Sequence, residues 1–156
     1  MIRKMIISDI VKVTQIESKV LGNTLGIDFL YDELNVNPFA HYFVYLINNE
    51  IIGYIGFRIY DDSAEMMNFV INTNHQNQGY GQELFDYCLE YITNLNVKNI
   101  SLEVRKSNTK AKRFYTKNGF LKIAELQKKL EDYKKDLKPN KPCPLCGSLD
   151  HPLAEN

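Results

Sequence analysis

The chain has 156 residues, of which 44% are hydrophobic and 24% charged, the composition of an ordinary globular domain. The 19 Lys and Arg residues equal the 19 Asp and Glu residues, which argues against a nucleic-acid or membrane-surface protein. No apolar run approaches the length of a membrane span, and the three cysteines make no disulfide framework. We therefore expect a cytoplasmic protein with reduced thiols and without nucleic-acid or membrane partners.

The first part of the chain predicts one strand and two helices. Residues 1–7 alternate loosely as a strand does, and Ser8 is a candidate N-cap for a helix over residues 9–21. Residues 24–35 predict a second helix, which the Asn-Pro pair at 37–38 closes. The residues expected to face inward are Ile10, Val13, Ile16 and Val20 in the first helix and Ile27, Leu30, Tyr31 and Leu34 in the second.

The middle of the chain changes period and predicts an antiparallel meander. Three strand-like runs, 41–47, 51–60 and 64–71, are joined by short polar turns. A polar, glycine-bearing segment then leads into a helix over residues 82–95, and a short strand is expected at 100–105. A helix over 108–119 and the beginning of another strand at 120–123 complete this part, so the predicted fold class is α+β, or α/β in some schemes.

The last part of the chain has a different pattern. Apolar residues recur at spacings of three and four, with Glu and Lys between them, as in a coiled coil. We therefore predict a domain over residues 1–123, a coiled-coil-like helix over 124–138 and a cysteine-containing tail over 139–156. The heptad positions are Ile123, Leu126, Leu130, Tyr133 and Leu137.

The glycine-bearing segment "HQNQGYG" is a candidate anion site. Gly79 and Gly81 leave the backbone accessible, and free N–H groups together with the dipole favour an anion at the start of a helix. It is not a Walker loop, because no Gly-Lys-Ser/Thr follows, and it is not a Rossmann fingerprint, because Leu84 occupies the position of the third glycine. A plain strand-to-helix turn remains the alternative. Six basic residues and no acidic residue between 105 and 117 would attract a phosphorylated ligand, or form a solvated helix face.

Two motifs give the chain a family resemblance. The stretch "QNQGYG" fits Q/R-x-x-G-x-G/A, and "LEVRKSNTKAKRFYTKNGF" fits L-E-V-R-x-S-N-x-x-A-x-x-x-Y-x-x-x-G-F. With these motifs, residues 1–122 resemble a GNAT-superfamily N-acetyltransferase of the branch that acetylates ribosomal-protein alanine (RimI-type). The resemblance implies a twisted, mostly antiparallel sheet flanked by helices, and acetyl-CoA as the acetyl donor.

The resemblance also implies roles for individual residues. Glu103 would be the general base, acting through water, and Tyr115 the acid that protonates the coenzyme A thiolate. From the sequence pattern alone, Glu103 is equally a solvent-facing strand residue and Tyr115 a packing residue. Asn108 would contact the cofactor arm. The pantetheine arm would lie along Phe69, Val70 and Ile71, and the pyrophosphate on Asn77, Gln78, Gly79, Tyr80, Gly81 and Gln82. No role is expected for Cys88, His41 or His75.

The family pattern stops at about residues 121–123, and the usual final strands are not expected. Residues 124–156 instead resemble a fragment of the zinc hook of SbcC-type nuclease ATPases, in which Cys143 and Cys146 would supply half of a tetrahedral zinc site. The other half would come from a second copy, so a zinc-linked homodimer is one expected partner. A zinc knuckle with His151 lacks its fourth ligand, because Asn156 occupies that position.

The sequence thus predicts an acetyl-CoA-dependent N-acetyltransferase. Its acceptor would be a protein N-terminal amine, and the resemblance points to alanine of a small-subunit ribosomal protein. The alternatives are a GNAT enzyme acting on a lysine or a small amine, and an inactive fusion whose tail mediates zinc-dependent association.

Overall fold

The computed structural model describes residues 1–123 and 131–132. It divides into two compact units, Met1–Glu103 and Val104–Asn156. Cys143, Cys146 and His151 lie outside the described residues, as do all but two residues of the predicted helix 124–138. The domain boundary near residue 123 and the zinc half-site therefore stay predictions.

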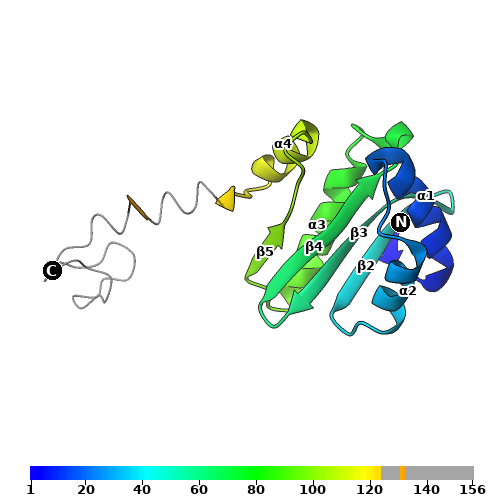
Figure 1. The fold of residues 1–156 in the computed structure, drawn as a ribbon, viewed down its shortest axis with the longest axis horizontal. Coiled ribbons are helices and arrows are strands. Elements are labelled where there is room, and N and C mark those ends of the chain that lie inside the picture. The colour runs from blue at the N-terminus through cyan, green and yellow to red at the C-terminus, as the bar shows by residue number, and fades with distance from the viewer. Residues whose placement is uncertain (124–130, 133–156) are drawn as a thin grey trace, which may run out of the picture. The chain divides into compact units, whose positions relative to one another are not determined.

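The first unit is built on a sheet with the strand order β1-β2-β3-β4-β5 (Figure 1). Neighbouring strands from β1 to β4 are antiparallel, whereas β5 runs parallel to β4. This order confirms the predicted meander, which consists of β2, β3 and β4. The strands are β1 (Ile2–Lys4), β2 (Ala40–Ile47), β3 (Glu50–Tyr60), β4 (Ser63–Ile71) and β5 (Asn99–Leu102).

Helices cover both faces of this sheet (Figure 1). On one face lie α1 (Ile10–Leu21), which follows the short 3-10 turn η1 (Ile7–Asp9), and α2 (Ile27–Asn35). The other face carries α3 (Tyr80–Asn94), which the 3-10 turn η2 (Thr73–His75) precedes. The second unit contains α4 (Thr109–Lys117). The core beneath α1 and α2 consists of Met5, Ile10, Val13, Ile16, Leu30, Tyr42, Val44, Leu46, Ile51, Tyr54 and Val70.

A bulge in β4 decides where the sheet opens. Gly56 of β3 is opposite Asn68, but the next residue, Phe57, is opposite Met66, so Met67 is an extra residue in β4. The parallel pairing with β5 extends only as far as Met66. Beyond the bulge, β4 continues to Ile71 beside β3 but without a paired residue in β5.

Two details of the N-terminal helices differ from the prediction. Ser8 is not a cap; instead the Asp9 carboxylate accepts a hydrogen bond from the Ile6 N–H at 2.9 Å and pairs with Arg3 at 2.7 Å. Ile27 and Tyr31 were expected to face inward but are 52% and 44% exposed. Only one stripe of this short helix, which contains the fully buried Leu30, packs on the core, so Ile27 and Tyr31 lie outside the packed stripe.

The strand expected at 120–123 is also wrong. Residues 120–122 have no regular structure and Ile123 is helical. Gly119 has a left-handed φ of 92°, and the Phe120 N–H is bonded to the Tyr115 carbonyl at 3.0 Å. The chain therefore folds back onto the end of α4 in a helix C-cap, and the Phe120 amide is used there instead of in a sheet.

We expect Gly56→Ala to destabilise the protein, although alanine is usually better than glycine inside a strand. The added Cβ would overlap the ring of Tyr42, which is 3% exposed and cannot move aside. Overpacking of this kind costs about 1–3 kcal/mol. Urea denaturation measures the loss, with Ser101→Ala on the exposed side of β5 as the control. A Gly56→Ala variant as stable as the wild type would contradict the packing described here.

Candidate active site

The predicted anion loop has the geometry of an open helix start. Gly79 is the N-cap of α3, with a left-handed φ of 90°, and Asn77 is also left-handed, with a φ of 61°. A Cβ added at Gly79 would meet no atom within 4 Å, so space is left beside the backbone. The first N–H groups of a helix have no acceptor within the helix and carry its positive partial charge. This loop can therefore hold a phosphate or pyrophosphate.

Side chains hold the loop in place at both ends. The Gln76 amide donates to the Ile71 carbonyl at 2.8 Å, and the Gln78 amide donates to the Asn74 carbonyl at 3.0 Å. In the first turn of α3, the Glu83 carboxylate accepts a hydrogen bond from the Tyr45 hydroxyl at 2.7 Å. Burial and the bond to Glu83 raise the pKa of Tyr45 to about 12. These anchors were not predicted from the sequence, because no local pattern signals a contact between β2 and α3.

The loop lies directly beside the end of β4. A Cβ added at Gly81 would be 3.6 Å from side-chain atoms of both Ile71 and Phe69. The Phe69 ring also stacks on Phe85 of α3, with 6.3 Å between ring centroids. The structure thus brings together the two sets of residues that were predicted to hold pyrophosphate and pantetheine. These contacts lie beyond Met66, the last residue of β4 that pairs with β5.

Two buried polar atoms lie just after β4. Asn72 Oδ1 and His75 Nδ1 have no hydrogen-bond partner within the described part of the chain. Buried polar groups are usually paired, so atoms of this kind mark places where water or a ligand completes the site. The His75 ring also lies 6.2 Å from the Tyr80 ring at the start of α3. No role was expected for His75 from the sequence.

The predicted catalytic residues belong to different units. Glu103 follows the last residue of β5 and is exposed at the end of the first unit. Tyr115 is in α4 of the second unit, between the rings of Phe114 and Phe120, each with its centroid 5.6 Å away. Burial raises the pKa of Tyr115 to about 12, so its hydroxyl is protonated at neutral pH. Their roles as base and acid stay predictions.

Asn108 has a structural contact of its own. It is the N-cap of α4, and its side-chain oxygen accepts a hydrogen bond from the Ala111 N–H at 3.1 Å. This cap sets the direction in which α4 begins. Its predicted contact with the cofactor arm is untested.

Cys88 has the environment of a packing residue. It is fully buried on α3, and burial raises the pKa of its thiol to about 12. A thiol of this kind is a poor nucleophile at neutral pH. This agrees with the expectation that Cys88 has no catalytic role.

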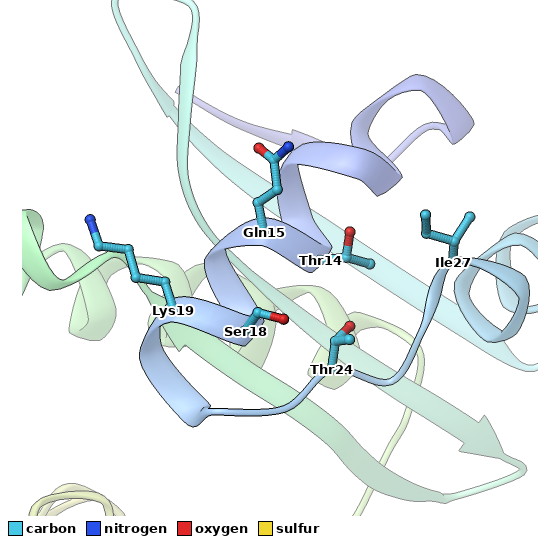
Figure 2. Close-up of a pocket in the computed structure, with 6 residues that line it drawn as sticks. All are labelled: Thr14, Gln15, Ser18, Lys19, Thr24 and Ile27. Atoms are coloured by element: carbon cyan, nitrogen blue, oxygen red, sulfur yellow. The ribbon is translucent and has the colours of Figure 1, made fainter.

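A shallow pocket lies elsewhere on the first unit. It is formed by α1, the linker after it and the first residue of α2 (Figure 2). The lining residues are Thr14, Gln15, Ser18, Lys19, Thr24 and Ile27. The lining includes no residue of the glycine loop, and none of its residues was predicted to bind the cofactor or to act in catalysis.

No group of His, Cys, Asp and Glu side chains suited to a metal ion occurs in residues 1–123 and 131–132. Over the same residues, no helix is long and apolar enough to cross a membrane.

Comparison with known proteins agrees with this geometry. Residues 11–120 match the model of the acetyltransferase (GNAT) family. A protein of Bacillus subtilis (strain 168), assigned as a ribosomal protein bS18-alanine N-acetyltransferase, is 35% identical over 118 residues, which cover 76% of this chain and 78% of that protein.

Two crystal structures have the same fold. The ribosomal-protein-S18-alanine N-acetyltransferase of Escherichia coli superposes with a TM-score of 0.73 at 20% identity, over 79% of this chain and 78% of that chain. The paia N-acetyltransferase of Thermoplasma acidophilum, solved in complex with coenzyme A, gives a TM-score of 0.68 at 19% identity, over 78% of this chain and 89% of that one. These likenesses confirm the predicted α+β fold.

Proposed function

Because the chain belongs to the acetyltransferase (GNAT) family, we propose that it transfers an acetyl group from acetyl-coenzyme A directly to the α-amino group of a protein N-terminus. The proposed acceptor is the N-terminal alanine of ribosomal protein S18, which the assignment of the 35% identical relative supports. One structural observation carries the proposal. The glycine loop at the start of α3 adjoins β4 at Phe69 and Ile71, beyond Met66, where the pairing of β4 with β5 ends.

The residues at this place suit a long ligand with an anionic end. The open backbone at Gly79 and the first amides of α3 would hold the pyrophosphate. The end of β4, from Phe69 to Ile71, has no paired β5 residue, so an extended pantetheine arm would lie along it. The proposed transfer is direct and uses no acyl-enzyme on Cys88, whose thiol is buried.

The chemistry needs one base and one acid. Acetyl-coenzyme A supplies the acetyl group as a thioester. Glu103 would take a proton from the acceptor ammonium, through water, so that the nitrogen lone pair can attack. The new N–C bond forms as the C–S bond breaks, and Tyr115 would give its proton to the departing thiolate. Because burial raises the pKa of Tyr115 to about 12, its phenol carries a proton at neutral pH, which is the form that a general acid requires.

A thermal melt and a peptide assay test this function together. A saturating concentration of acetyl-CoA, about 100 times its Kd, is expected to stabilise the fold by about 2.7 kcal/mol. A peptide with an N-terminal alanine should then release coenzyme A thiol, and the same peptide with a blocked N-terminus should not. If only a lysine-containing, N-blocked peptide or a small amine releases thiol, the proposed acceptor is wrong. Thermal stabilisation without thiol release from any amine would reduce the protein to a cofactor binder.

We expect Tyr115→Phe to lower kcat on the N-terminal alanine peptide by about a hundredfold or more, because general acids contribute factors of this size. The Kd for acetyl-CoA should stay within about twofold of the wild-type value. Tyr31→Phe is the matched control, since Tyr31 is an exposed tyrosine of α2. Equal kcat values for Tyr115→Phe and the wild type would rule out Tyr115 as the acid.

Gly79→Ala should weaken acetyl-CoA binding by about tenfold, because relief of the left-handed strain moves the loop amides. Gly22→Ala provides a matched comparison. Gly22 is the C-cap of α1, with a φ of 75°, and an added Cβ there also meets nothing within 4 Å. Both variants should lose about 1–2 kcal/mol of stability, but only Gly79→Ala should change the Kd measured by calorimetry. The same Kd in both variants would show that the loop is not the anion site.

A further inference from the structure

Glu83 is an acidic side chain in the first turn of the helix whose start is the proposed anion site. It lies one turn after Gly79, and its N–H is bonded to the Gly79 carbonyl at 3.0 Å. The other charged residues of α3 are Asp86 and Glu90, so this helix contains no Lys or Arg. A carboxylate in the first turn is attracted to the same positive helix end that favours a phosphate. Glu83 and a bound pyrophosphate would therefore compete for one end of α3.

The geometry of a helix directs the Glu83 side chain toward the loop. Every Cα–Cβ bond of an α-helix is tilted toward the N-terminus, and a long side chain covers the turn that precedes its own Cα. For Glu83 this is the turn that contains Gly79 and Tyr80. A carboxylate without a partner would thus lie near the amides that begin the helix, where its charge would repel a phosphate.

Tyr45 of β2 gives this carboxylate a partner elsewhere. The Tyr45 hydroxyl donates a hydrogen bond to Glu83 Oε2 at 2.7 Å, a length typical of a bond to a charged acceptor. The tyrosine is 6% exposed, so its position is fixed by packing. Burial and the bond to Glu83 raise the pKa of Tyr45 to about 12, so its hydroxyl remains a donor at neutral pH. The carboxylate is therefore held on the side of α3 that faces β2.

Tyr45 has a second contact with the start of α3. Its ring packs edge-on against the ring of Tyr80, with 5.4 Å between the centroids. Tyr80 is the first residue of α3 and belongs to the predicted pyrophosphate loop. The hydroxyl and the ring of Tyr45 thus have different partners, so a phenylalanine at this position removes the contact with Glu83 and keeps the contact with Tyr80.

We propose that Tyr45 is a positioning residue for the cofactor, which holds the Glu83 carboxylate against β2 and away from the amides that would bind the pyrophosphate. The inference rests on the proposed function. It adds that β2, which supplies none of the predicted cofactor-binding residues, controls the charge at the anion site through one hydroxyl group.

Tyr45→Phe is the direct test, because it releases Glu83 and preserves the packed ring. The Kd for acetyl-CoA, measured by calorimetry, should rise about fivefold, the effect of one charge near a helix end. The Kd for 3′-dephospho-coenzyme A, which retains the pyrophosphate, should rise by the same factor in this variant. A rise for acetyl-CoA alone would place the effect at the 3′-phosphate and would overturn the proposal.

The exposed position of Glu83 allows two further variants that separate its charge from its bond. Glu83→Gln removes the charge and should bind acetyl-CoA at least as tightly as the wild type. Glu83→Asp keeps the charge on a side chain too short to reach Tyr45, so the Kd should rise about fivefold as in Tyr45→Phe. Weaker binding by Glu83→Gln would show that the carboxylate assists the cofactor, contrary to the proposal.

A double-mutant cycle distinguishes this role from simple packing. In the Glu83→Gln background, adding Tyr45→Phe should change the Kd for acetyl-CoA by less than about twofold, because no charge is left to hold. If Tyr45 only supported the helix, its replacement would weaken binding by the same factor in both backgrounds, and this result would overturn the proposal. Glu83→Asp decides alone if Tyr45→Phe does not fold.

Tyr42→Phe is the matched control on the same strand. Tyr42 is 3% exposed and also donates its hydroxyl to a carboxylate, that of Glu33 in α2, at 2.9 Å. Because α2 covers the opposite face of the sheet, Tyr42→Phe should lower Tm and leave the Kd for acetyl-CoA unchanged. A wild-type protein that binds no acetyl-CoA refutes the proposed function. A wild type that binds it, with an unchanged Kd in Tyr45→Phe and Glu83→Asp, refutes only the role of Tyr45.

Discussion

The main-chain N–H and C=O groups of β4 need hydrogen-bond partners along the whole strand, but β5 pairs with β4 only as far as Met66. Each backbone N–H and C=O needs a partner, so the place where the two strands part constrains everything around it. The bulge at Met67 sets this place, because it shifts the register of β4 against β3. The glycine loop at the start of α3 and the Glu17 carboxylate of α1, which is bonded to Asn68, both contact the segment that follows.

The two buried glutamates of the first unit solve different problems. Glu33 has a cationic partner, since the Arg58 guanidinium lies 2.6 Å from its carboxylate and keeps the pKa of that carboxyl low against the effect of burial. It ties α2 to β3 as a conventional ion pair does. Glu17 is held by neutral donors only among its described contacts, and those donors come from a linker and from two strands. Glu33 thus fixes α2 on the sheet, whereas Glu17 fixes the linker after α1 relative to the end of β4.

The sequence was informative where the signal is local. The three strand-like runs joined by short polar turns predicted the meander. Gly79 and Gly81 indicated the loop, because the absence of a side chain at both positions is visible in the sequence itself. The face of α1 that contains Val13 and Ile16 was readable from helical spacing. The bond between Glu17 and Asn68 joins residues 51 positions apart, and no periodicity reports such a contact. The prediction of a strand after Gly119 was wrong for a related reason. The apolar residues there are typical of a strand, but the Phe120 N–H is used in the C-cap of α4 and is not available to a sheet.

Two side chains form hydrogen bonds with backbone groups at the end of β4, where a neighbouring strand would otherwise pair. The Gln76 amide donates to the Ile71 carbonyl, and the Asn68 oxygen accepts from the Phe69 N–H. The Gln76 side-chain amide offers the same donor as a peptide group and rotates about single bonds, so an amide of a ligand can replace it. The Asn68 amide, which is also bonded to Glu17 and Tyr54, stays in place. An extended ligand laid along β4 would therefore exchange one amide partner for another and would not have to desolvate bare peptide groups. Because these side chains already bond the backbone groups at the end of β4, a strand from a second molecule cannot easily pair there. The sheet can therefore stay open between β4 and β5 without the aggregation hazard of an exposed edge.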